Sequence, residues 1–138
     1  MSDLPRGIVS PHVSDARGSE HEFSVTADVR DDVLVLAVSG QADLHTAPEV
    51  RALLTDALDD GRRRVVVDLT ETTFIDSMML GVLLGALKRV KGHSGQLAVA
   101  CPDPSLRRVF EITSLDRVLD LPETVDDAID VVRRDPDG

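Results

Sequence analysis

The chain has 138 residues, 42% of them hydrophobic, and a formal net charge of −10 from 25 acidic and 15 basic residues. This length suits one domain with one core, and the negative charge argues against direct binding to nucleic acid or to an anionic membrane surface. No apolar stretch approaches the roughly 20 residues that span a bilayer, and the N-terminus lacks the apolar core of a signal peptide, so we expect a cytoplasmic protein.

The first predicted elements are two strands. Residues 1–20 mix Pro, Gly, Ser and charges without periodicity, which predicts a disordered leader; we expect the domain at 21–134 and a disordered tail at 135–138. Residues 21–29 (HEFSVTADV) alternate apolar and polar side chains, as a half-buried strand does. Residues 33–40 (VLVLAVSG) are apolar at nearly every position, which predicts a strand buried on both faces. The two strands are expected to form a hairpin.

Residues 45–61 carry the signals of a helix. Thr46 and Glu49 have the spacing of a capping box, Pro48 falls in the first turn, and Gly61 follows the end. Apolar residues recur at helical spacing and predict a buried stripe made of Val50, Leu53, Leu54, Ala57 and Leu58.

The remaining elements alternate between strand and helix. They are a strand at 62–69, a helix from Ser77 to about Gly92, a strand at 96–101, a helix at 103–113, a strand at 117–121 and a helix at 123–134. The resulting order, β-β-α-β-α-β-α-β-α, predicts an α/β fold with a mixed, mostly parallel central sheet flanked by helices. Cys101 is the only cysteine, which excludes an internal disulfide, and we expect it to pack at a strand end.

Residues 72–88 read TTFIDSMMLGVLLGALK and place Ser77 between an aspartate and an apolar helix. Serine is a favoured N-cap, because its hydroxyl accepts a hydrogen bond from a first-turn N–H, and this is the structural interpretation of Ser77. The functional interpretation is that Ser77 is phosphorylated, since a helix N-terminus offers free donors and a positive dipole end.

Functional loops of α/β sheets lie at the carboxyl ends of the strands, where this chain places Asp43, His45, Thr46, Asp76 and Ser77. A Ser-His-Asp hydrolase is disfavoured, because the serine lacks the Gly-x-Ser-x-Gly turn and no Gly-rich oxyanion loop is present. The sequence has no nucleotide-binding glycine motif, its histidines lack metal-ligand spacing, and its three Phe are too few for base stacking. We therefore expect a protein-binding module without catalytic activity, cofactor or metal.

Three segments together resemble one family. VVVDL, then FIDS, then LGVLLGALKRVK are similar to the signature of the STAS domain of bacterial anti-sigma factor antagonists. GQADLHTA resembles that family's Gly-Glu-Leu-Asp loop, and PSLRRVFEITSLDRVLDL resembles its next helix and strand. The resemblance covers residues 21–134 and implies the STAS fold.

The resemblance also implies a function. In this family the serine after the aspartate is phosphorylated by a partner that is both anti-sigma factor and serine-protein kinase. The unphosphorylated antagonist binds that partner and frees the sigma factor, phosphorylation breaks the complex, and a phosphatase restores it. By position, Ser77 is the phosphorylation site, and the expected partner-binding residues are Asp43, His45, Thr46, Asp76, Met78 and Met79.

The chain departs from the family beside the serine. Met78 and Met79 replace a Ser or Thr followed by Gly, and Gln41 replaces a Glu. Neighbouring helix residues point about 100° apart, so at least one of the two methionines is expected to be exposed. The change favours an alternative function, a phosphorylation-independent scaffold or adaptor subunit of a larger complex.

Overall fold

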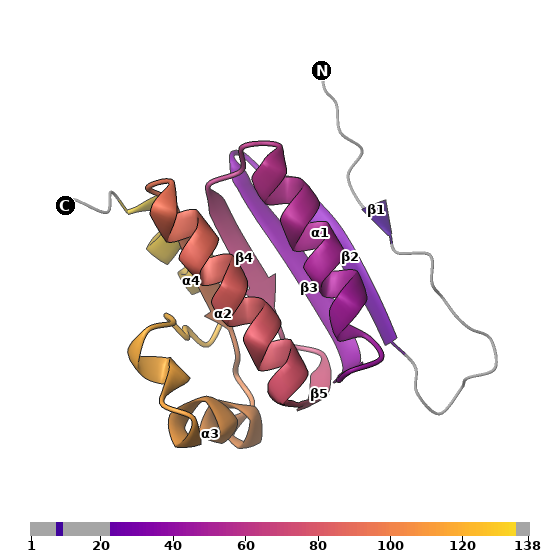
Figure 1. The fold of residues 1–138 in the computed structure, drawn as a ribbon. Coiled ribbons are helices and arrows are strands. Elements are labelled where there is room, and N and C mark those ends of the chain that lie inside the picture. The colour runs from indigo at the N-terminus through magenta and orange to yellow at the C-terminus, as the bar shows by residue number, and fades with distance from the viewer. Residues whose placement is uncertain (1–7, 10–22, 135–138) are drawn as a thin grey trace.

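The computed structural model describes residues 8–9 and 23–134, which form a central sheet with helices on both of its faces (Figure 1). The strands are β1 (Ile8–Val9), β2 (Phe23–Arg30), β3 (Val33–Ala42), β4 (Arg64–Asp68), β5 (Thr72–Ile75) and β6 (Gln96–Ala100). The helices are α1 (Ala47–Asp59), α2 (Ser77–Gly92), α3 (Pro104–Ile112) and α4 (Val125–Arg133), with a 3₁₀ turn, η2, at Leu115–Arg117.

The sheet is mixed, as the sequence predicts. β1, β2 and β3 pair antiparallel, whereas β3, β4 and β6 run parallel, and β5 pairs parallel with the end of β3. Leu34 of β3 lies opposite Val65 of β4, which confirms that these two buried strands are neighbours. The parallel strands all end at one edge of the sheet, and the candidate site lies there.

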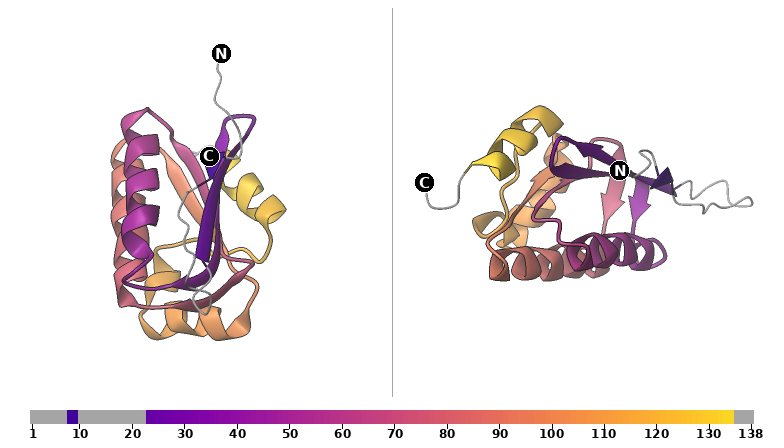
Figure 2. Two further views of the ribbon diagram at one scale, coloured as in Figure 1. Left: turned by 90° about the vertical axis from the view of Figure 1, so that its right-hand side faces the viewer. Right: turned by 90° about the horizontal axis from the view of Figure 1, so that it is seen from above.

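Alternate side chains of β3 enter two different cores, because successive strand residues point to opposite faces. Leu34 and Leu36 pack with α1 and α2 in the larger core, and Val33 and Val35 pack with α4 in the smaller one. Figure 2 shows these layers, with α1 and α2 side by side on one face and α4 on the other. Burial on both faces explains why the strand is almost continuously apolar.

The strand β5 was not predicted. Residues 72–75 fall in the segment interpreted as a loop, although Thr, Phe and Ile favour extended structure. β5 is anchored by the buried Thr72 hydroxyl, which donates to the Val38 carbonyl over 2.7 Å. The pairing with β3 shifts register between Gly40 and Gln41, and Gly40 has a φ of 93°, which glycine adopts readily.

The prediction of a strand at 117–121 is wrong for most of its length. The chain forms η2 and then a single bridge between Asp120 and Ala98 of β6. The N–H groups of Val99 and Cys101 donate to the Asp120 and Pro122 carbonyls, each over 2.9 Å. Pro122 has no N–H to extend the ladder, so this segment covers the edge of β6 without becoming a full strand.

The predicted leader and tail fall largely outside the described residues. Within 1–20 the structure describes only β1, whose two β-branched residues pair with Ala27 and Thr26 of β2, where the sequence predicted no regular structure. A strand of two residues is too short for periodicity to reveal. Residues 10–22 and 135–138 are not described.

Candidate functional site

The candidate site lies where β3 and β5 end and where α1 and α2 begin (Figure 1). Ala42 and Ile75 are paired residues of the two parallel strands, and the Asp76 N–H donates to the Ala42 carbonyl over 3.1 Å. The residue after each strand is an aspartate, Asp43 and Asp76 respectively. The structure therefore brings the two predicted loops together, with Ser77 as the first residue of α2.

Asp76, and not Ser77, is the N-cap of α2. Asp76 has extended backbone angles (φ −120°, ψ −178°), and its Oδ1 accepts hydrogen bonds from the N–H groups of Met78 (3.0 Å) and Met79 (3.1 Å). The structural interpretation of Ser77 as the N-cap is thus wrong, because Ser77 already lies inside the first turn. Its exposed hydroxyl has no hydrogen-bond partner among the described residues.

Removing the carboxylate of Asp76 is expected to destabilise α2. Asp76→Ala leaves two first-turn N–H groups without their acceptor, and the loss of such a cap costs about 0.5–2 kcal/mol of unfolding free energy. Asp76→Asn keeps an acceptor oxygen and should lose much less, and Ser77→Ala should be close to neutral. Urea unfolding of the three variants tests this; a larger loss for Ser77→Ala than for Asp76→Ala would contradict the assignment.

The Asp43 loop is held by Thr46. The Thr46 Oγ1 accepts a hydrogen bond from the Asp43 N–H (2.9 Å) and lies within donating distance of the carbonyls of Gln41 (2.9 Å) and Asp43 (3.2 Å). Oδ1 of Asp43 accepts from the N–H of the exposed His45 (2.9 Å). The side chain of Thr46 thus bonds back into the loop, which fixes the position of Asp43.

The predicted capping role of Thr46 is wrong for the same reason. Thr46 precedes α1 with helical backbone angles (φ −104°, ψ −21°), and its side chain makes no cap hydrogen bond to the helix. An N-cap side chain reaches the third helical N–H from an extended backbone, as Asp76 does. Thr46 is half-buried and committed to the loop, so it positions Asp43.

The model of the STAS domain family matches residues 24–128, which is most of the chain and nearly all of the described part. The chain belongs to the STAS domain family. The site residues of this STAS domain, Asp43, Asp76 and Ser77, all lie inside the matched range.

Three of the similar proteins show the relationship. A Thermotoga maritima protein, named as a candidate anti-sigma factor antagonist, is 30% identical over 75% of this chain and 93% of its own length. The structure of an anti-sigma factor antagonist from Mycobacterium paratuberculosis has a TM-score of 0.77 at 28% identity, over 84% of this chain and 98% of that one. The phosphorylated form of SpoIIAA from Bacillus has a TM-score of 0.63 at 26% identity, over 81% of this chain and 100% of that one.

The two methionines of the STAS domain have opposite environments. The side chain of Met78 is 51% exposed, whereas Met79 is fully buried among the core residues under α2. The prediction that at least one of them is exposed is confirmed. Met79 was also expected to contact a partner; this stays a prediction, and the burial of Met79 in the core of its own domain disfavours it.

Sequence reasoning missed two apolar residues at this end of the STAS domain. Leu44, next to Asp43, is 55% exposed, and Phe74, on β5, is 47% exposed. Together with Met78 we call them the apolar rim, meaning three exposed apolar side chains on the segments that carry Asp43 and Ser77. The sequence gives little sign that Phe74 is exposed, because the next residue, Ile75, is buried. The two side chains differ in exposure only because the segment forms a strand, β5, that pairs with β3.

Cys101 packs at the end of β6, as predicted, and is fully buried. Burial raises the pKa of its thiol from 9.0 to about 11, opposed by Arg107 and reinforced by Asp103. The thiol therefore stays protonated and unreactive near neutral pH. Within residues 8–9 and 23–134, no three His, Cys, Asp or Glu side chains are grouped to hold a metal ion, and no helix is long and apolar enough to cross a membrane.

Proposed function

We propose that this STAS domain binds an anti-sigma factor through the surface around Ser77 and thereby releases a sigma factor. In this proposal the anti-sigma factor is also a serine-protein kinase, and it phosphorylates Ser77 to end the complex. A phosphatase removes the phosphate and restores binding. The catalytic step belongs to the partner, and the protein acts in the cytoplasm, where sigma factors meet RNA polymerase.

The observation that carries this proposal is the state of the Ser77 hydroxyl. It is exposed at the start of a helix, it is unpaired among the described residues, and Ser77 directly follows Asp76, whose N–H is bonded to the residue before Asp43. A kinase needs such an accessible hydroxyl, whereas a structural cap would be bonded to the helix. Asp76 supplies the cap, so modification of Ser77 would leave the fold intact.

The electrostatics of the site support a switch. A helix N-terminus normally stabilises a phosphate through its free N–H groups, but Asp76 already occupies those of Met78 and Met79. A phosphate would add about −1.5 to −2 charge beside Asp43 and Asp76 in a protein of net charge −10. The added charge would therefore increase the negative charge of the surface that the proposed partner contacts.

The similar proteins support the same proposal by their names. Relatives at 29–30% identity are named anti-sigma factor antagonists, and SpoIIAA has been determined in a phosphorylated form. The second candidate function is a phosphorylation-independent scaffold. The observation that favours it is Met78, a large exposed side chain directly after Ser77, where the family has Ser or Thr.

The test is phosphate transfer to Ser77. Each anti-sigma factor kinase of the source organism is incubated with ATP and either the wild-type protein or Ser77→Ala, and incorporation is measured by intact-mass spectrometry. We expect one phosphate per wild-type chain and none in Ser77→Ala, since alanine removes only the acceptor.

Ser105→Ala is the matched control, because Ser105 is an exposed serine in the first turn of α3, which is also capped by an aspartate, Asp103. It should be phosphorylated like wild type. Equal incorporation in Ser77→Ala and wild type would remove Ser77 from this role. Binding of a partner without any phosphate transfer would favour the scaffold.

A further inference from the structure

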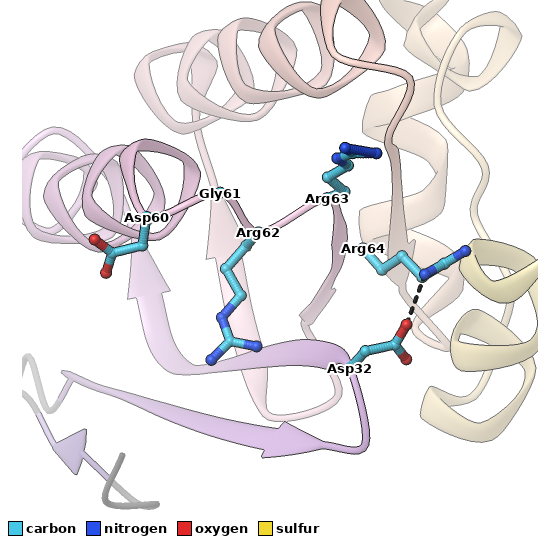
Figure 3. Close-up of a pocket in the computed structure, with 6 residues that line it drawn as sticks. All are labelled: Asp32, Asp60, Gly61, Arg62, Arg63 and Arg64. Carbon is cyan, nitrogen blue, oxygen red and sulfur yellow. Dashed lines mark hydrogen bonds and ion pairs between the residues drawn. The ribbon is translucent and has the colours of Figure 1, made fainter. Parts of the chain in front are cut away.

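A second charged surface lies at the end of the sheet opposite Ser77. β4 begins there with Arg64 and runs towards the candidate site, ending at Asp68. The connection from α1 to β4 and the β2–β3 turn enclose an open hollow of about 460 Å³ (Figure 3). Its lining is almost entirely charged and consists of Asp32, Asp60, Gly61, Arg62, Arg63 and Arg64.

Most of the arginines near this hollow are neutralised by the protein itself. Arg64 pairs with Asp32 at 2.6 Å and also donates to the Val132 carbonyl, Arg89 pairs with Asp59 at 2.8 Å, and Arg133 pairs with Asp31. The guanidinium groups of Arg62 and Arg63, in contrast, have no hydrogen bond or ion pair with any described residue. Two adjacent cations are thus left unpaired in a chain with ten more acidic than basic residues.

The directions of the two side chains constrain what they can bind. Figure 3 shows Arg62 extending towards the β2–β3 hairpin and Arg63 extending to the other side of the chain. Arg63 also lines a small hollow with Ser94, Gly95 and Gln96. Because the two guanidinium groups diverge, they do not converge on one small anion. A ligand that reaches both must be extended and carry more than one negative group.

The carboxylates of the hollow favour one kind of extended anion over another. Asp32 and Asp60 also line the hollow, and Asp60 has no ion pair with a described residue. A nucleic acid, with a phosphate on every unit, would bring its charges against these carboxylates and against the net negative protein. A polypeptide can space its carboxylates and place neutral or donor groups opposite Asp60.

We propose that Arg62 and Arg63 form a docking surface for an acidic polypeptide segment of a partner protein. The surface lies at the opposite end of β4 from the Ser77 site, so it can be occupied while the anti-sigma factor is bound. It is independent of the proposed switch. With two separated surfaces on one domain, this protein can bind a second partner protein while the anti-sigma factor occupies the first surface.

A titration of the full chain tests the proposal. The probe is a peptide of about eight residues that alternates glutamate and serine, which spans about 25 Å when extended. It is added to ¹⁵N-labelled protein and followed by NMR, with a glutamine-for-glutamate peptide as the neutral probe. We expect saturable shifts of the backbone amides of residues 61–64 and of the arginine Nε–H signals, weakening as salt is raised.

The double variant Arg62→Gln/Arg63→Gln is expected to bind the acidic peptide about tenfold or more weakly than wild type does. Arg108→Gln should bind it with wild-type affinity. Arg108 is the matched control, since it is an exposed arginine on α3 without an ion pair to a described residue. Unchanged binding in the double variant would overturn the proposal. Equal shifts with the neutral peptide or inorganic phosphate, or tighter binding of a short oligonucleotide, would overturn it too. Kinase transfer to Ser77 should be unaffected in the double variant.

Discussion

Met79→Ala is expected to lower the free energy of unfolding by about 2–5 kcal/mol, because it removes a fully buried side chain and leaves a cavity under α2. Met78→Ala, one residue earlier, should change it by less than about 0.5 kcal/mol, since half of that side chain is already exposed to solvent. The two variants remove the same atoms from the same helix turn. Urea unfolding, monitored by circular dichroism, measures both.

Val118→Ala is a further control, because Val118 is as exposed as Met78, at 51%, and lies outside α2. It should also be close to neutral. Equal destabilisation by Met78→Ala and Met79→Ala would contradict the placement of Met79 in the core. If the side chains that surround position 79 in Met79→Ala collapse into the cavity, the loss of unfolding free energy should be about 2 kcal/mol, the lower end of the expected range.

The opposite environments of the methionines change how the family difference is interpreted. The resemblance places a glycine at position 79, and the sequence alone does not say whether the methionine there lies on the contact surface. In the structure Met79 fills the core, so only Met78 can alter the contact surface. Replacing both methionines by the family residues would confuse a binding effect with a loss of stability, whereas Met78→Ser alone tests the surface.

The sequence predicted the main elements because their signals are local and strong. β3 and β4 are continuous apolar runs. In α2 the leucines that recur at helical spacing lie in the core (Leu80, Leu83 and Leu87) or partly buried against it (Leu84). The proximity of Asp43 and Ser77 also followed, because parallel strands end at one edge of a sheet. These inferences need only periodicity and chain order.

What the sequence could not predict depends on backbone angles and on pairing between distant segments. Asp76 and Thr46 are both good caps by type, but Asp76 is extended and caps its helix, whereas Thr46 is helical and bonds into its loop. Phe74 is exposed because it points away from the face of β5 that Ile75 buries, and β5 itself forms only by pairing with β3. Neither outcome is encoded in a window of neighbouring residues.

The apolar rim determines how a phosphate on Ser77 would act. A partner that covers Leu44, Phe74 and Met78 removes water from the segments around the serine, and aromatic residues and methionine are enriched at protein interfaces. A charge placed in a contact that excludes water loses its hydration, and in this first turn Asp76 already accepts from two of the N–H groups that could replace it. Desolvation of the phosphate and its repulsion by the carboxylates of Asp43 and Asp76 would then both weaken the complex.

Ser77→Asp is therefore expected to weaken binding of the anti-sigma factor about tenfold or more, which corresponds to about 1.4 kcal/mol. Ser77→Ala should bind as wild type, because it keeps a small neutral side chain and Asp76 still caps α2. Ser105→Asp is the matched control for charge, since it adds the same carboxylate to the first turn of another aspartate-capped helix, and it should change affinity less than about threefold. Calorimetry of the three variants against the partner decides the matter: equal weakening by Ser77→Asp and Ser105→Asp would mean that overall charge, and not a covered surface around Ser77, controls the complex.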